Sequence, residues 1–102
     1  MQQGESKVFE FLRNGRSAQG FLLRYGESYH AYLNQCCHWP TPLDMGDGEF
    51  YYADIDRILC KTHGAVYLPD TGVCDYGPCV NAKLDSFPLI LKNDYVLITL
   101  PE

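Results

Sequence analysis

Two short Cys/His pairs are the residues of this chain best suited to chemistry. Cys36 and His38 form a C-x-H pair, and Cys60 and His63 form a C-x-x-H pair, with residues 39–59 between them. Each pair places one thiolate and one imidazole on a tight loop, so that all four donors can reach one centre. Two sulfur and two imidazole ligands suit either one tetrahedral zinc or a [2Fe–2S] cluster with both cysteines on one iron and both histidines on the other. The pairs alone therefore predict a metal centre and leave its kind open.

The residues around the pairs favour the cluster. A Pro-Leu step follows the first pair, a glycine follows the second histidine, an aromatic residue comes four positions after that histidine, and a Thr-Gly turn and a Gly-Pro loop come later (Pro42-Leu43, Gly64, Tyr67, Thr71-Gly72 and Gly77-Pro78). With this ordered set the chain resembles the Rieske iron–sulfur proteins over most of its length, and within them the small soluble Rieske-type ferredoxins. The resemblance implies one [2Fe–2S] cluster per chain, with Cys36, His38, Cys60 and His63 as its ligands.

The function that the resemblance implies is one-electron transfer. Cys36 and Cys60 would bind one iron as thiolates, and His38 and His63 would bind the other as neutral imidazoles. Because all four ligand positions come from protein, iron has no open site for a substrate. We therefore expect no catalytic residue and no enzyme, but a carrier or component of a multicomponent oxidoreductase. It would take electrons from a reductase and pass them to a terminal oxygenase or another redox protein.

Three alternatives stay open on the sequence. The small subunit of an assimilatory nitrite reductase looks like the same domain and differs only in its partner. A redox sensor would use the same cluster. A structural zinc module for protein interaction would use the same four ligands without electron transfer.

Departures from the family pattern bear on the reduction potential. Rieske subunits of respiratory and photosynthetic complexes carry a further cysteine in each ligand loop, and the two form a disulfide; the matching positions here are Thr41 and Thr62. Those subunits also place a serine two residues after the second histidine, where its hydroxyl bonds a cluster sulfur and raises the potential. Here that residue is Ala65, which has no hydroxyl. Tyr67 could keep the family's other hydrogen bond, which goes to a ligand sulfur. The resemblance thus implies a potential toward the bottom of the Rieske range of about −150 to +300 mV.

Composition narrows the class of protein further. The chain has 102 residues, five cysteines and a formal net charge of −5. One domain with one core is expected at this length. An odd number of cysteines without a secretion signal disfavours a disulfide framework and favours metal binding in the cytoplasm. The acidic balance argues against nucleic acid or an anionic membrane as partner, since phosphate binding needs clustered Lys and Arg, and no apolar run approaches the roughly 18 residues of a membrane span.

The expected fold class is all-β, since tyrosines are many and helix signals few. Residues 7–12 and 19–25 read as strands on either side of Asn14-Gly15, a strong hairpin signal, and residues 29–33 as a third. Short strands are expected at 50–53, 57–59, 65–68 and 73–76, and two final strands at 87–92 and 95–100 should pair with the first three. The resemblance implies a single Rieske domain over 1–102, an antiparallel β sandwich or barrel. Its basal part spans about 7–33 and 84–100, with a cluster-binding part of about 34–83 inserted.

The remaining candidate residues receive structural interpretations. Cys37 is the spare cysteine of the first pair, and His30 is given a structural or surface role. Cys74 and Cys79 could pair on spacing, but a reducing compartment favours two free, partly buried thiols. Five carboxylates between the ligand loops predict an acidic face, either merely solvated or a docking patch for a basic partner: Asp44, Asp47, Glu49, Asp54 and Asp56.

Overall fold

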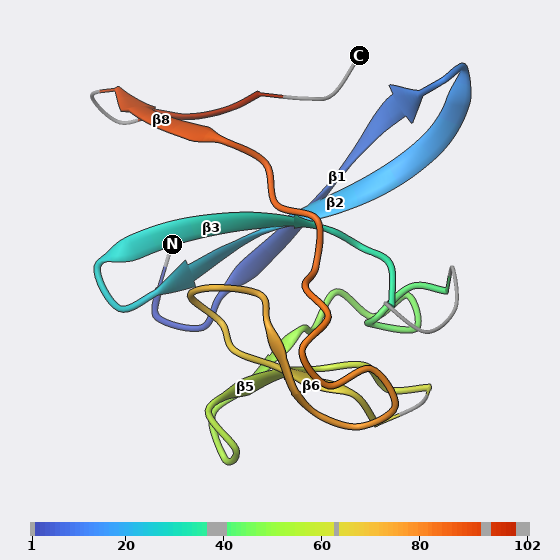
Figure 1. The fold of residues 1–102 in the computed structure, drawn as a ribbon. Coiled ribbons are helices and arrows are strands. Elements are labelled where there is room, and N and C mark those ends of the chain that lie inside the picture. Colours follow the sequence, from blue (N-terminus) through green and yellow to red (C-terminus); the bar gives the residue numbers. More distant parts are fainter. Residues whose placement is uncertain (1, 37–40, 63, 93–94, 100–102) are drawn as a thin grey trace.

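The regular structure of the described residues consists of nine β-strands and no helix. The computed structural model describes residues 2–36, 41–62, 64–92 and 95–99. Within these ranges the strands pair antiparallel in a three-stranded, a four-stranded and a two-stranded sheet (Figure 1). The all-β fold class is therefore confirmed. Over the same ranges, no helix has the length and apolarity that crossing a membrane requires.

The first sheet is the predicted meander. Its strands are β1 (Ser6–Arg13), β2 (Arg16–Tyr25) and β3 (Ser28–Leu33), in that order. Asn14 and Gly15 join β1 to β2 with φ angles of 53° and 77°. Two successive positive φ angles define the two-residue turn that matches the twist of a hairpin, and so the Asn-Gly signal is confirmed.

The second sheet carries the segments around the two ligand pairs. Its strands follow the order of the chain: β4 (Tyr51–Tyr52), β5 (Arg57–Leu59), β6 (Val66–Tyr67) and β7 (Cys74–Tyr76). The first ligand loop lies between β3 and β4, and the second lies between β5 and β6. In Figure 1 this sheet lies below the first one.

The last two strands, β8 (Leu89–Lys92) and β9 (Tyr95–Ile98), pair only with each other among the described strands. The prediction that they join the meander is wrong. The chain does meet β3 just before β8: Leu33 N–H donates to the Asp85 carbonyl (2.8 Å), and Phe87 N–H donates to the Ala31 carbonyl (2.9 Å). Pro88 follows, and it has no N–H with which to continue the ladder. The hairpin consequently separates from the first sheet (Figure 1).

Apolar side chains cover both faces of the first sheet, which explains why three successive residues at the end of β3 are all buried. One face contributes Phe21, Leu23 and Tyr32 to the larger core, which extends into the second sheet. The Phe21 and Phe50 rings stack there with centroids 3.8 Å apart. The other face forms a smaller cluster of Phe11, Ala31, Leu33 and Phe87. The Phe21–Phe50 stack thus joins the meander to the part of the chain that carries the cysteines.

Replacing Phe21 by alanine should destabilise the protein severely. Phe21 is fully buried, and loss of a core phenylalanine costs about 3–5 kcal/mol. Chemical unfolding followed by far-UV circular dichroism measures the change in free energy. Leu12→Ala is the matched control, because Leu12 is 71% exposed on the same sheet and should change stability by less than about 0.5 kcal/mol. Equal stability of the two variants would contradict the packing described above.

Candidate metal centre

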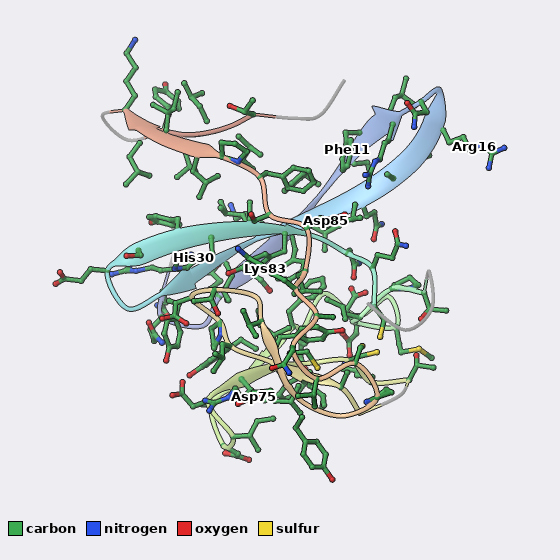
Figure 2. The ribbon with its side chains drawn as sticks, in the orientation of Figure 1. Phe11, Arg16, His30, Asp75, Lys83 and Asp85 are labelled. Atoms are coloured by element: carbon green, nitrogen blue, oxygen red, sulfur yellow. The ribbon has the colours of Figure 1, made fainter. Side chains whose placement is uncertain are left out.

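The two cysteines of the ligand pairs lie in the same core. Cys36 follows β3 and is 2% exposed, and Cys60 follows β5 and is fully buried. Both belong to the larger hydrophobic cluster, and neither is in a disulfide. His38 and His63, together with the spare Cys37, lie outside the described residues. The structure thus brings the two predicted sulfur ligands together from segments far apart in the sequence, and Figure 2 shows the sulfur atoms of the described side chains gathered in the lower part of the molecule.

Asn34 connects the two ends of the first ligand loop. Its side-chain oxygen accepts from Leu43 N–H (2.8 Å), and its amide nitrogen donates to Asp44 Oδ1 (3.1 Å). Inside this closure Cys36 N–H donates to the Thr41 carbonyl (2.9 Å). Both Asn34 and Asp44 are buried, so these bonds are shielded from water and hold the two ends of the loop together.

The second ligand loop closes in the same compact way. Cys60 N–H donates to the Ala65 carbonyl (2.8 Å), and Gly64 N–H donates to the Cys60 carbonyl (2.9 Å). Gly64 has φ of 72°, a conformation that residues other than glycine rarely adopt. Lys61 N–H then donates to the Leu43 carbonyl across 3.1 Å, which ties the second loop directly to the first.

The Gly-Pro segment packs its backbone on the second ligand loop. Gly77 has φ of 113°, and a β-carbon added there would lie 2.8 Å from Ala65 Cα. Such a contact with backbone cannot be relieved by rotating a side chain, so only glycine fits.

Tyr67 is the aromatic residue predicted to contact a ligand sulfur. Its hydroxyl lies 3.6 Å from Cys36 Sγ, and its ring is fully buried. A phenol O–H is a donor and a thiolate accepts, so the bond would favour the charged form of the sulfur. The contact crosses from β6 to the first ligand loop and joins the two halves of the site.

Asp44 departs from the acidic face that the sequence predicted. It is 2% exposed, whereas the other four carboxylates of that group are exposed. Burial would raise the pKa of its carboxyl, but bonds from Asn34 and from the backbone N–H groups of Gly48, Gly46 and Asp44 itself outweigh burial and lower it. Asp44 is thus an ionised group that closes the first ligand loop. Spacing alone could not separate it from its solvated neighbours.

The cysteines outside the two pairs differ from each other. Cys74 is a buried free thiol on β7, as predicted. Cys79 is disulfide-bonded, so the expectation of a free thiol is wrong there, and the Cys74–Cys79 pair that spacing would permit is not formed. His30 lies on β3 with its ring stacked on Tyr32 at 6.3 Å. Burial lowers the pKa of His30.

The donors present fit an iron–sulfur centre. Two buried thiols lie on loops that are hydrogen-bonded to each other, and a phenol lies at one of the sulfurs. One buried side-chain atom, Thr41 Oγ1, has no hydrogen-bond partner among the described residues. Within residues 2–36, 41–62, 64–92 and 95–99, no group of three or more His, Cys, Asp or Glu side chains converges on one point. Two buried thiols on an all-β scaffold suit a metal centre with thiolate ligands.

Comparison with known proteins identifies the family. The Rieske [2Fe-2S] domain matches residues 2–89, and the chain therefore belongs to the Rieske family. As a member it binds one [2Fe–2S] cluster, which decides against the zinc centre that the Cys/His pairs left open. No curated protein matches the chain.

Solved structures of two ferredoxins resemble this chain. The ferredoxin of carbazole 1,9a-dioxygenase from Nocardioides aromaticivorans IC177 has a TM-score of 0.69 and 24% identity, over 96% of this chain and 86% of its own. A complex of reduced oxygenase and oxidized ferredoxin in carbazole 1,9a-dioxygenase gives a TM-score of 0.69 and 28% identity, over 97% of this chain and 92% of that one. At 24% identity, the match to the Nocardioides ferredoxin supports a shared fold alone.

Replacing Asp44 by asparagine should destabilise the first ligand loop in a pH-dependent way. Hydrogen bonds to a charged group contribute about 1.5–3 kcal/mol, and the variant loses that charge. Because the folded-state pKa of Asp44 is lowered, its contribution is complete above the ordinary carboxyl pKa of about 3.9 and is lost as the pH falls through the folded pKa. Chemical unfolding between pH 7 and pH 3 should show a stability difference from the unsubstituted protein that shrinks only below about pH 4.

Asp54→Asn is the matched control, because it removes an equal charge from an exposed side chain. It should leave the unfolding curves nearly unchanged. If Asp44→Asn behaves like this control at pH 7, the closure of the loop by Asp44 is refuted.

Proposed function

We propose that this chain is a one-electron carrier whose cluster is held by Cys36, His38, Cys60 and His63. The observation that carries the proposal is the burial of Cys36 and Cys60 in one core, on two loops tied by the Lys61–Leu43 bond, within a Rieske domain. We further propose that 1–102 forms a single domain in which the cluster-binding part, about 34–83, is inserted between the basal segments 7–33 and 84–100.

The described residues support electron transfer in three ways. Burial of both cysteines keeps water from the sulfur ligands, and low exposure is one of the factors that set the potential of such a centre. The hydrogen bonds of Asn34 and Asp44 hold the two ends of the first ligand loop together, which limits the reorganisation that a change of charge requires. The Tyr67 hydroxyl offsets negative charge on Cys36 sulfur. The cluster itself supplies a site that gains and loses one electron without making or breaking a bond to substrate.

The proposed partners are a reductase as donor and an oxygenase or other redox protein as acceptor. One similar solved structure is a complex of reduced oxygenase and oxidized ferredoxin. Its matching chain is 28% identical to this one. The net charge of −5 and the exposed carboxylates Asp47, Glu49, Asp54 and Asp56 suit a partner with a basic docking surface. We place the protein in the cytoplasm and assign it no catalysis of its own.

The ligand assignment is tested by removing one predicted thiolate. Cys60→Ser should abolish binding of the cluster, measured as iron and acid-labile sulfide per chain, because a serine hydroxyl is a poor ligand for this soft-ligand centre. Cys74→Ser is the matched control, since Cys74 is equally buried but belongs to neither ligand pair. Retention of a full cluster in Cys60→Ser would refute the assignment.

The Tyr67 contact should be visible in the reduction potential. The potential of the unsubstituted protein is expected below about 0 mV, in the lower part of the Rieske range. Tyr67→Phe should lower it by roughly 20–65 mV, which corresponds to the 0.5–1.5 kcal/mol of an ordinary hydrogen bond in a one-electron couple. Protein-film voltammetry measures both values. An unchanged or higher potential in Tyr67→Phe would show that its hydroxyl does not donate to the sulfur.

A further inference from the structure

Thr41 carries a buried hydroxyl with no partner among the described residues. Its Oγ1 is the one buried side-chain oxygen or nitrogen in that part of the chain for which no hydrogen bond is found. Leaving such a group unsatisfied costs about 1–3 kcal/mol, and native proteins rarely do so. The hydroxyl therefore indicates a partner outside the described residues.

The backbone of Thr41 places this hydroxyl at the first ligand loop. The Thr41 carbonyl accepts from Cys36 N–H at 2.9 Å, which makes Thr41 the hydrogen-bonded neighbour of a proposed sulfur ligand. In the second loop, Ala65 occupies the position at which Rieske subunits of respiratory and photosynthetic complexes carry a serine. Ala65 is fully buried and has no hydroxyl. A donor from the first loop would therefore compensate for the one that the second loop lacks.

We propose that the Thr41 hydroxyl donates a hydrogen bond to a sulfur of the cluster and raises its reduction potential. The acceptor is either the Cys36 thiolate or an inorganic sulfide, which share the chemistry of an electron-rich sulfur. Reduction adds negative charge to the centre, so a donor at sulfur stabilises the reduced form more than the oxidised form. The inference rests on the proposed ligand role of Cys36. Thr41 acts as a positioning and tuning residue and not as a ligand.

Thr62 provides a natural contrast. It lies in the second ligand loop, but it is exposed, and its hydroxyl donates to Met45 Sδ at 3.0 Å. The two threonines thus occur in corresponding loops. The Thr41 hydroxyl is buried and has no partner among the described residues, whereas Thr62 is exposed and its hydroxyl has one.

The test compares Thr41→Val, which removes the hydroxyl at nearly constant volume, with Thr41→Ser, which keeps it, and with Thr62→Val. The first measurement is the midpoint potential. Thr41→Val should make the cluster several-fold harder to reduce by a common donor, where tenfold corresponds to 59 mV for one electron. Thr41→Ser and Thr62→Val should stay within the error of the unsubstituted protein. Thr41→Ala makes the same comparison with a smaller side chain.

A second measurement separates a bond to sulfur from a structural effect. The Fe–S stretching bands in resonance Raman spectra should shift on transfer to D₂O, and part of that shift should disappear in Thr41→Val but persist in Thr41→Ser. Equal potentials and equal isotope shifts in Thr41→Val and the unsubstituted protein, both with a full complement of iron, would overturn the inference and leave a buried water as the partner. Loss of iron from the unsubstituted protein in favour of zinc would instead overturn the proposed function.

Discussion

The candidate site depends on the backbone hydrogen bond from Lys61 N–H to the Leu43 carbonyl, which joins the two ligand loops. Each loop is closed by a bond of its own, from Cys36 N–H to the Thr41 carbonyl and from Cys60 N–H to the Ala65 carbonyl. The Lys61–Leu43 bond and the Tyr67–Cys36 contact together set their relative position. A centre that takes one cysteine from each loop requires that position, because iron–sulfur bonds tolerate little variation in length and angle.

Buried polar side chains support this arrangement. Asn34 and Asp44 sit at the base of the first loop, and both are satisfied by hydrogen bonds. A network of this kind in a low-dielectric interior is stable only if every member has a partner, and it then specifies a single conformation. The Tyr67 hydroxyl lies 3.6 Å from Cys36 Sγ, and the Thr41 hydroxyl is proposed to donate to a sulfur of the centre. The chain thus separates the residues that shape the loop from those that would adjust the charge on the sulfurs.

Much of this could be predicted from the sequence, because it follows from local patterns. Asn14-Gly15 allows few other turns, and that turn sets the pairing of the strands on either side of it. The cysteine spacing and Tyr67 were enough to predict a sulfur-ligand site, with His38 and His63 outside the described residues. Three features required the fold. Asp44 looks like its solvated neighbours in the sequence, and only its burial distinguishes it. The effect of Pro88 on the last hairpin depends on which strand the chain approaches there. The lack of a hydrogen-bond partner for Thr41 Oγ1 among the described residues depends on packing.

The measurement that tests the central claim most directly is electron paramagnetic resonance before and after reduction with dithionite, with iron, zinc and sulfide counted on the same sample. A signal of rhombic shape that appears only on reduction, with about two irons and two sulfides per chain, is the result predicted for mixed cysteine and histidine ligation. A protein that stays silent in both states and holds about one zinc per chain would contradict the account, because zinc has no redox chemistry.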